Sequence, residues 1–357
     1  MSGLQRRQVV HPKNRFETLS VEWDEGVERP QDTKIFKEEA QSILSKNDSP
    51  DLPFRFSVNP YRGCAHACAY CYARPTHEYL GYSAGTDFET RIIAKVNAPE
   101  LLEKELSKRT WTHESLAFSG VTDCYQPVEQ ALGLTRRCLE VCLRRNTPVG
   151  IVTKSALILR DLDLLKALAE GPGLSVVISI PFGVADEAKL LEPFVPSPET
   201  RFRVLEKLSS VGIRTGLSIS PIIPGWNDSE IPKLLRQAKE KGAAFAFYVL
   251  LRLPGATEAV FFERIRQDFP ERMGKMEHHL RSTRAGALNQ STFVTRMRGE
   301  GEMAKMIADL FRIHTAKNGL ENGERMAGIV PQGGEKKKHV RKEVGLVPRR
   351  LQTNLFD

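Results

Sequence analysis

Three cysteines, Cys64, Cys68 and Cys71, lie within one short segment in the spacing Cys-x3-Cys-x2-Cys. The residues between them are mostly small, so a loop carrying them could turn tightly. Three thiolates on one loop can bind three irons of a 4Fe–4S cluster, whereas four thiolates would saturate it. The fourth iron would keep an open position, and open positions on protein-bound metals usually serve substrate or cofactor chemistry. The spacing therefore predicts an iron–sulfur site with three protein ligands.

A zinc site is the alternative interpretation of the same residues. His66 or His77 could complete a Cys3His set, but structural zinc sites usually combine two separated ligand pairs, and a second pair is missing here. Cys138 and Cys142 are four residues apart on an apolar helical pattern, so we expect buried core thiols there. The alternative would make the chain a zinc-bound, non-enzymatic nucleic-acid-binding protein.

Short β-rich runs alternate with amphipathic helical patterns through the middle of the chain. The runs are 54–58, 115–119, 149–153, 174–180, 215–220 and 244–251, and the helical patterns are 128–144, 162–169 with Asp161 as its cap, 200–209 and 229–241. This alternation predicts an α/β fold with a parallel sheet. Because eight strands would close a full barrel, six predict a partial (β/α)6 barrel with its site at the carboxyl ends of the strands.

The pattern divides the chain into four expected parts. These are an N-terminal extension at 1–52 with a short helical pattern at 34–45, the core at 53–255, a C-terminal helical region at 256–327 and a basic tail at 328–357. We expect the helices at 256–281 and 303–317 to pack against the open side of the partial barrel. The composition of the tail predicts disorder.

Composition and charge point to a soluble, cytoplasmic protein with no membrane partner. The longest apolar run, 243–251, is too short for a membrane span, and the first residues lack the pattern of a secretory signal. The net charge is +8. Much of the excess lies in the last residues, as either a solvated tail or a contact for nucleic acid.

The final residues contain the pattern Gln-x-x-Leu-Phe, formed by Gln352, Leu355 and Phe356. It resembles the peptide that bacterial replication and repair proteins insert into the sliding clamp. A Leu-Phe pair on a flexible tail suits an apolar pocket, with the glutamine as a hydrogen-bonding anchor. Docking onto the chain itself is the alternative.

The pattern Cys-x3-Cys-x-aromatic-Cys after the first strand of a partial barrel resembles the radical S-adenosylmethionine (SAM) superfamily. The resemblance implies a 4Fe–4S cluster on Cys64, Cys68 and Cys71, with SAM bound to its unique iron. It implies reductive cleavage of SAM to methionine and a 5′-deoxyadenosyl radical, which abstracts a hydrogen atom from the substrate. It also implies an external one-electron donor of the flavodoxin or ferredoxin type, and it places Tyr70 against the adenine. A hydrophobic staple for the loop is the alternative role of this ring.

Segments that follow the later strands resemble the spore photoproduct lyase-related branch of this superfamily. The resemblance implies that Gly120, Thr122 and Asp123 lie near the amino group of SAM. It implies that Lys154 and Ser179 contact the carboxylate or ribose of SAM. An ordinary salt bridge is the alternative for Lys154, because a lysine at a strand end needs an anionic partner.

One departure from that branch concerns the hydrogen-atom donor. The lyase uses a cysteine on the motif after the second strand, and Gly120 takes that position here. Cys124 lies four residues further on and could replace the donor if it faced the ribose of SAM; alternatively it is an inert buried thiol. The substrate therefore stays open between DNA, as for a repair lyase, and a peptide or small metabolite.

Overall fold

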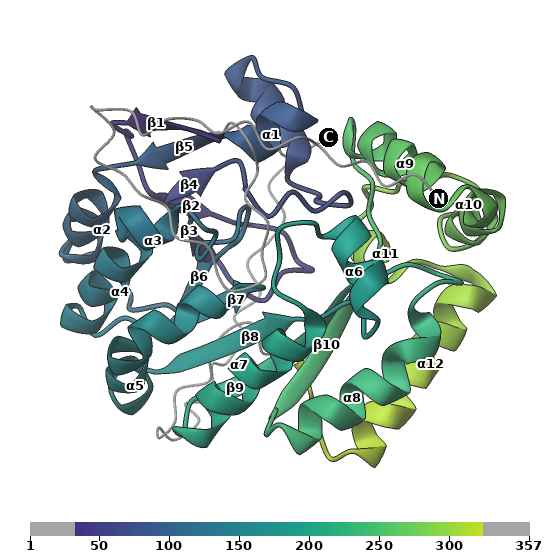
Figure 1. The fold of residues 1–357 in the computed structure, drawn as a ribbon. Coiled ribbons are helices and arrows are strands. Elements are labelled where there is room, and N and C mark those ends of the chain that lie inside the picture. The colour runs from purple at the N-terminus through teal and green to yellow at the C-terminus, as the bar shows by residue number, and fades with distance from the viewer. Residues whose placement is uncertain (1–32, 324–357) are drawn as a thin grey trace, which may run out of the picture.

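A sheet with the strand order β11-β10-β9-β8-β7-β6-β3-β2 forms the centre of the molecule in a computed structural model that describes residues 33–323 (Figure 1). Its strands are β2 (Leu44–Lys46), β3 (Phe56–Val58), β6 (Leu116–Phe118), β7 (Val149–Thr153), β8 (Leu174–Ser179), β9 (Arg214–Ile222), β10 (Phe245–Leu250) and β11 (Glu321–Asn322). All neighbouring strands are parallel except β2 and β3. The six expected strands, β3 and β6 to β10, lie in chain order, which confirms the partial barrel of an α/β fold.

Helices between the strands cover the outer face of this sheet (Figure 1). They are α2 (Ala98–Leu106), α3 (Glu129–Leu132), α4 (Leu134–Arg144), α5 (Leu162–Glu170), α7 (Pro198–Ser210) and α8 (Ile231–Glu240), with short 3-10 turns η2 (Ala156–Asp161) and η3 (Asp228–Glu230). The short helix α6 (Ala185–Leu191) lies instead against the cysteine loop, where the Leu191 carbonyl accepts from the Ala69 amide at 2.9 Å. The helix expected over 128–144 is split into α3 and α4 at Gly133, whose φ of 60° is left-handed and ends the first helix. Cys138 and Cys142 are fully buried in the core beneath α4, as expected.

A second, small sheet contradicts the helical pattern expected at 34–45. Its order is β1-β5-β4, with β1 (Lys34–Glu38), β5 (Arg91–Lys95) and β4 (Tyr61–Arg62). β1 pairs in parallel with β5, whose central residues Ile92 and Ala94 are buried. A short apolar pattern does not distinguish a strand from a helix, and here pairing with β5 decides the outcome. The sheet leads directly through β4 into the cysteine segment.

The C-terminal helices are α9 (Thr257–Asp268), η4 (Pro270–Arg272), α10 (Met273–Ser282), α11 (Thr295–Arg298) and α12 (Gly301–Lys317). For α12 the expected position against the open side of the barrel is wrong. Its Ile307 and Phe311 are buried in the outer core, and Phe311 packs against Tyr248 of β10 with ring centroids 4.7 Å apart. α12 thus covers the outside of β10 and leads into β11, which extends the sheet.

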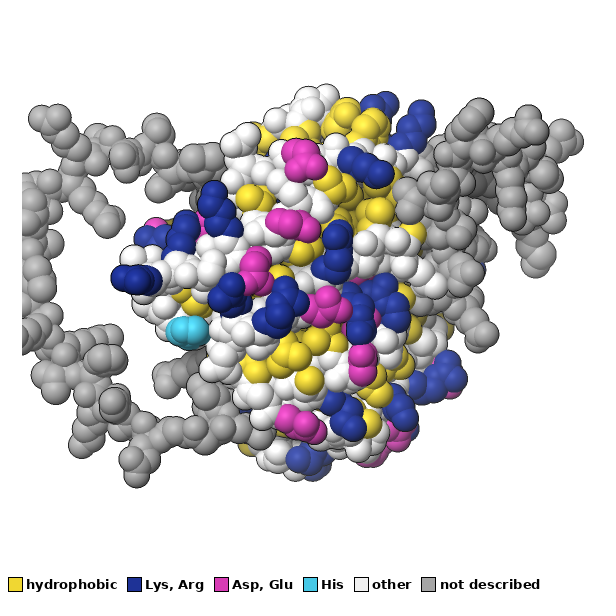
Figure 2. Space-filling model, turned by 90° about the vertical axis from the view of Figure 1, so that its left-hand side faces the viewer, with side chains coloured by type: hydrophobic (Ala, Val, Ile, Leu, Met, Phe, Trp, Pro, Cys, Tyr) yellow, Lys and Arg dark blue, Asp and Glu magenta, His cyan; other side chains and the backbone are white. Residues whose placement is uncertain are grey.

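The exterior over α2 and α4 carries charges of both signs, interspersed with apolar side chains (Figure 2). Glu103 of α2 pairs there with Arg144 at 3.0 Å and with Arg145, and exposed pairs of this kind contribute little to stability.

A hollow of about 500 Å³ lies at the end of the sheet opposite the cysteine loop. It is lined by residues that precede the strands, including Pro148 and Gly173. Within residues 33–323, no helix is both long and apolar enough to span a membrane.

The inner face of β9 carries small and polar side chains. Leu217 and Ile219 of β9 belong to the core shared with the outer helices. Alternation along the strand therefore turns Gly216, Ser218 and Ser220 to the inner face. The Ser218 hydroxyl donates to that of Ser220 at 2.9 Å. Small residues on this face leave room for the longer side chains that follow the strand ends.

Gly216 provides a test of the packing between β9 and β10. A Cβ atom there would lie 2.3 Å from Cε2 of Phe245, its register partner on β10. We therefore expect Gly216→Ala to lower the free energy of unfolding by about 1–3 kcal/mol, the usual cost of overpacking. Thermal unfolding followed by circular dichroism measures it. Gly274→Ala is the control, because a Cβ there meets no atom within 4 Å; equal stability of the two variants would contradict the prediction.

Candidate functional site

The three cysteines lie on the loop that follows β3 and β4, at the carboxyl edge of the main sheet. Cys64 and Cys68 are buried and Cys71 is half-buried. The loop turns tightly, since the N–H of Cys71 donates to the carbonyl of Cys68 at 3.2 Å. It starts at Gly63, whose φ is +76° and where a Cβ would lie within 3.0 Å of His77 and of two backbone oxygens. Only glycine fits this start of the loop without strain.

The side chain of Arg74 binds backbone carbonyls of the cysteine loop. Arg74 is the first residue of η1 (Arg74–Leu80), and its side chain is fully buried. Its guanidinium donates to the carbonyls of Ala67 (3.3 Å), Cys68 (2.8 and 3.1 Å), Ala84 (3.0 Å) and Gly85 (3.1 Å), and to the carboxylate of Glu89 (2.5 Å). Buried backbone carbonyls need partners, and this loop has too few of its own. One arginine therefore ties the second cysteine to the segment after η1.

The electrostatics of the three thiols suit a bound cationic centre. Burial raises the pKa of each thiol, and for Cys64 burial with the nearby Asp123 carboxylate raises it to about 12. The thiols also raise one another's pKa, which shows that they lie in mutual electrostatic range. A metal centre would offset the cost of ionising them together. Between residues 33 and 323, no three His, Cys, Asp or Glu side chains gather around the position of a single ion.

A group of polar side chains lies beside the cysteine loop; we call it the Glu192 group. It comprises Tyr70, Lys154, Ser179, Glu192 and Arg201. Glu192 is fully buried, accepts from the Tyr70 hydroxyl and pairs with Arg201 at 2.7 Å. Arg201 also donates to the carbonyl of Ser179 at 2.8 Å. The charge of this carboxylate is thus satisfied without Lys154.

Lys154 keeps the capacity to bind a further anion. Its ammonium donates to the Ser179 hydroxyl at 2.8 Å but stands 3.8 Å from Glu192. It also lies 5.8 Å from the ring centroid of Tyr70. A lysine has three donors, and a neutral hydroxyl with a distant carboxylate leaves it under-satisfied. The structure therefore brings together the predicted Tyr70, Lys154 and Ser179, and the salt bridge weighed as the alternative for Lys154 is a loose one.

The predicted residues after β6 connect the site elements. The Asp123 carboxylate accepts from the Thr153 hydroxyl and from the Lys154 amide, both at 2.8 Å, and lies 3.5 Å from Nδ1 of His66. Thr122 donates to the carbonyl of Tyr61 at 3.1 Å. These bonds join β7, the small sheet and the cysteine loop at one edge.

Gly120 lies against the inner end of β3. A Cβ there would stand 3.2 Å from Cβ of Ser57. The carbonyl of Gly120 accepts a hydrogen bond from the Tyr72 hydroxyl at 2.7 Å. The glycine thus lets the loop after β6 approach both β3 and the residue that follows Cys71.

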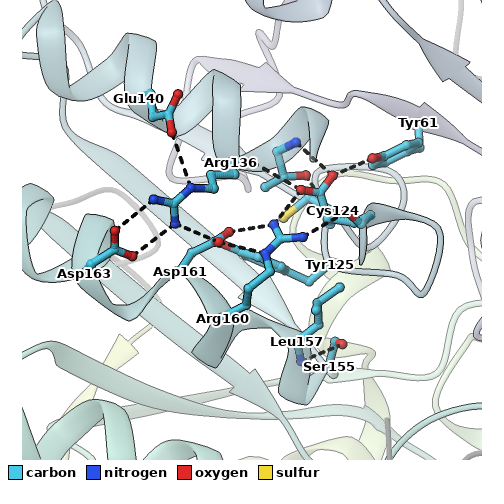
Figure 3. A network of polar contacts seen from close by, with 12 residues as sticks. Tyr61, Cys124, Tyr125, Arg136, Glu140, Ser155, Leu157, Arg160, Asp161 and Asp163 are labelled. Carbon is cyan, nitrogen blue, oxygen red and sulfur yellow. Dashed lines mark hydrogen bonds and ion pairs between the residues drawn. The ribbon is translucent and has the colours of Figure 1, made fainter. Parts of the chain in front are cut away.

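A buried ionic network supports the loop after β6 (Figure 3). Glu129 and Asp161 are both fully buried. Arg160 bridges them, at 2.9 and 2.8 Å, and Arg136 pairs with Asp161 at 3.0 Å. The expected capping role of Asp161 is wrong, since its side chain makes no cap bond to α5 and serves this network instead.

Cys124 lies on the core side of the same loop. It is 1% exposed and belongs to the outer core together with Tyr125 and Cys138. Its pKa is raised well above the usual thiol value, first by burial and then by Asp123. The structure does not bring this thiol into the Glu192 group, and its placement favours the inert-thiol alternative.

Two residues of the Glu192 group were missed from sequence. Glu192 stands between two helices without a motif around it. Arg201 carried a readable signal, because it shares the buried face of α7 with Val204, Leu205 and Leu208. A charged residue on an apolar helix face needs a buried partner.

Comparisons with known proteins agree with this geometry. The family profile of the radical SAM superfamily matches residues 58–238. The chain belongs to the radical SAM superfamily. It is therefore an enzyme of the radical SAM class, and membership implies SAM and a 4Fe–4S cluster as cofactors and the general need for an external electron donor.

Characterised function among the relatives is sparse. The chain is 35% identical over 234 residues to an uncharacterised protein of Mycobacterium tuberculosis, covering 65% of this chain and 69% of the relative. It is 31% identical over 238 residues to an uncharacterised protein of Methanocaldococcus jannaschii, covering 67% and 85%. The structure of spore photoproduct lyase complexed with dinucleoside spore photoproduct aligns with a TM-score of 0.59 and 18% identity over 81% of both chains. This last likeness concerns the fold.

Arg74 gives a testable prediction about the cysteine loop. Lysine cannot reach several carbonyls at once, and each buried polar group left without a partner costs about 1–3 kcal/mol. We expect Arg74→Lys to lose at least half of the iron bound per chain after anaerobic reconstitution, measured by iron and sulfide analysis. Arg62→Lys is the control, since Arg62 makes only a half-exposed contact to Glu38 at 3.3 Å. Full iron content in Arg74→Lys would contradict the proposed role of Arg74 in holding the cysteine loop.

Proposed function

We propose that this enzyme binds a 4Fe–4S cluster through Cys64, Cys68 and Cys71, binds SAM beside it and acts on a nucleotide in DNA. The observation that carries the cofactor part is the loop itself: three thiols lie on one turn, locked by Arg74, next to an under-satisfied lysine. Family membership supports the same ligands. The DNA part is supported by the fold it shares with spore photoproduct lyase, whose structure holds a dinucleoside.

The residues of the Glu192 group would bind and orient SAM. Lys154 would pair with its carboxylate, and the ring of Tyr70, fixed by the bond from its hydroxyl to Glu192, would provide an apolar surface for the adenine. Ser179 keeps the lysine in place. When bound, the reduced cluster and SAM supply an electron and an organic radical that abstracts a hydrogen atom. The buried surroundings of Cys68 and Tyr70 keep water away from that chemistry.

The proposed electron donor is a flavodoxin or ferredoxin. The sliding-clamp peptide at Gln352, Leu355 and Phe356 and the basic tail at 328–357 lie outside the described residues, and both stay predictions from sequence. The division into 1–52, 53–255 and 256–327 is likewise our proposal, although 33–52 already contributes β1 and β2.

Individual cysteine variants test the cluster. We expect Cys64→Ala, Cys68→Ala and Cys71→Ala each to abolish the 4Fe–4S spectrum, because a cluster bound by two thiolates is not retained. Cys138→Ala is the matched control and should keep full iron content, since its thiol is in the core. Electron paramagnetic resonance of the reduced proteins and iron analysis measure this. A colourless wild-type protein with one zinc per chain would support the zinc alternative instead.

A variant of Lys154 tests the SAM site. Losing a charge-assisted bond to a carboxylate costs about 1.5–3 kcal/mol, so we expect Lys154→Met to weaken SAM binding roughly ten-fold or more. Isothermal titration of the reconstituted protein under anaerobic conditions measures the affinity. Lys166→Met, on α5 beside the hollow at the opposite end of the sheet, should bind SAM as the wild type does. Equal affinities of the two variants would remove Lys154 from the site.

Reduction with SAM in the presence of deuterated DNA tests the reaction. Deuterium transferred from a lesion or nucleotide into 5′-deoxyadenosine would identify the hydrogen that is abstracted. Transfer from a peptide or small metabolite, with none from DNA, would overturn the proposed substrate and leave the cofactor chemistry intact.

A further inference from the structure

Four arginines gather where β10 ends, and we call them the arginine group: Arg252, Arg284, Arg296 and Arg298. Arg284 holds them together. Its guanidinium donates to the carbonyl of Leu251 at 2.8 Å and to those of Thr295 and Arg296 at 2.8 and 2.9 Å. These bonds tie α11 to the carboxyl end of β10. Because the strands are parallel, this end shares its edge with the cysteine loop and the Glu192 group.

Three members of the group have evident roles in the fold. Arg284 is buried and donates to backbone carbonyls. Arg296 forms a two-pronged ion pair with Asp51, at 2.6 Å for each bond. The guanidinium carbon of Arg298 lies 4.1 Å from the ring centroid of Tyr248.

Arg252 is different, because its charge has no adequate partner. Its Nη1 lies 3.6 Å from the sulfur of Met297, which is a weak acceptor, and its buried Nε, like that of Arg284, has no hydrogen-bond partner within residues 33–323. Among residues 33–323, no carboxylate lies within ion-pair distance of this guanidinium. Burial and the neighbouring Arg296 lower the pKa of Arg252, so the cation is desolvated and repelled at once. A bound anion would relieve both costs.

Two exposed aromatic rings lie beside the arginine group, one near Arg252 and one on Arg296. Tyr72 follows Cys71 directly, is 48% exposed and is in electrostatic range of Arg252. Phe293 is 49% exposed, and the guanidinium carbon of Arg296 lies 4.7 Å from its ring centroid. The next residue, Val294, has a φ of +70°, which is strained for a β-branched side chain. The fold thus holds a large apolar ring in solvent at some cost.

Arginine beside exposed aromatic rings is the arrangement by which proteins bind single-stranded nucleic acid: the cation takes a phosphate and the ring stacks on a base. An acidic peptide would use the cation but would leave the ring without a partner. We propose that Arg252 binds a backbone phosphate of a DNA strand and that Phe293 stacks on a base of that strand, at the mouth of the cysteine site. This inference rests on the proposed DNA substrate and specifies how the strand is held.

Fluorescence anisotropy with a fluorescein-labelled single-stranded DNA and the reconstituted full chain tests the phosphate contact. We expect Arg252→Gln to weaken binding roughly ten-fold and to reduce the slope of log K against log salt by about 0.7, the value for one phosphate on a single strand. Arg252→Lys should keep most of the slope, because lysine still binds phosphate as a point charge. Arg312→Gln removes an equally positive but remote, exposed charge on α12 and should bind as the wild type does.

The stacking contact has its own signature. We expect Phe293→Ala to weaken binding about ten-fold without changing the salt slope, and Phe293→Trp to restore affinity. Circular dichroism melting of each variant shows whether it is folded.

The outcomes separate this inference from the proposed function. Unchanged affinity and slope in folded Arg252→Gln would overturn the inference while DNA binding by the wild type stands. Equal loss in Arg312→Gln, or competition by poly-glutamate as strong as by unlabelled DNA, would also overturn it. Wild-type protein that binds no DNA would overturn both the inference and the proposed substrate. Formation of 5′-deoxyadenosine from SAM in the same preparation reports separately on the cofactor chemistry.

Discussion

The shape of the cysteine loop depends on side chains that bind its carbonyls and amides. Arg74 holds the loop at Ala67 and Cys68 from one side. Gln126 holds it from the other, donating to the carbonyl of Gly63 at 3.0 Å and accepting from the amide of Ala65 at 2.9 Å. The loop has no regular secondary structure, so these side-chain bonds, together with backbone bonds such as that from the Cys64 amide to the Phe88 carbonyl at 2.9 Å, fix where the three thiols stand. Everything else at this edge is placed relative to them.

Gln126 also makes the loop dependent on the buried ionic network. It lies in the segment between β6 and α3, which Glu129 anchors by accepting from Tyr61 and Arg160. Burial raises the pKa of Glu129, and its hydrogen bonds oppose that rise. Removing one partner from such a network leaves a buried charge without compensation, which costs more than the pair contributes. The network therefore supports the segment that carries Gln126, and through Gln126 it supports the cysteine loop.

Sequence reasoning succeeded where a local pattern carries the structure. Val149–Thr153 is a buried strand with ends that match the expected ones, and the cysteines and Lys154 lie at the edge that the parallel arrangement requires. It failed at Lys34–Glu38, where a distant partner strand decides the conformation. It also missed Glu192, since no neighbouring residue signals that Tyr70 and Arg201 will converge on it. Long-range pairing of this kind leaves no periodicity in the chain.

Two cations at the same edge, Lys154 and Arg252, lack a full set of hydrogen-bond acceptors. Their different positions suggest that they bind different anions. Lys154 lies next to Tyr70 and Ser179, and its side chain is 15% exposed. Arg252 lies near Tyr72, whose ring is 48% exposed, and we propose that a DNA strand lies there. The segment Cys71-Tyr72 runs between them, with the Tyr72 hydroxyl bonded to Gly120. A cofactor bound at Lys154 would thus lie next to a substrate strand bound at Arg252.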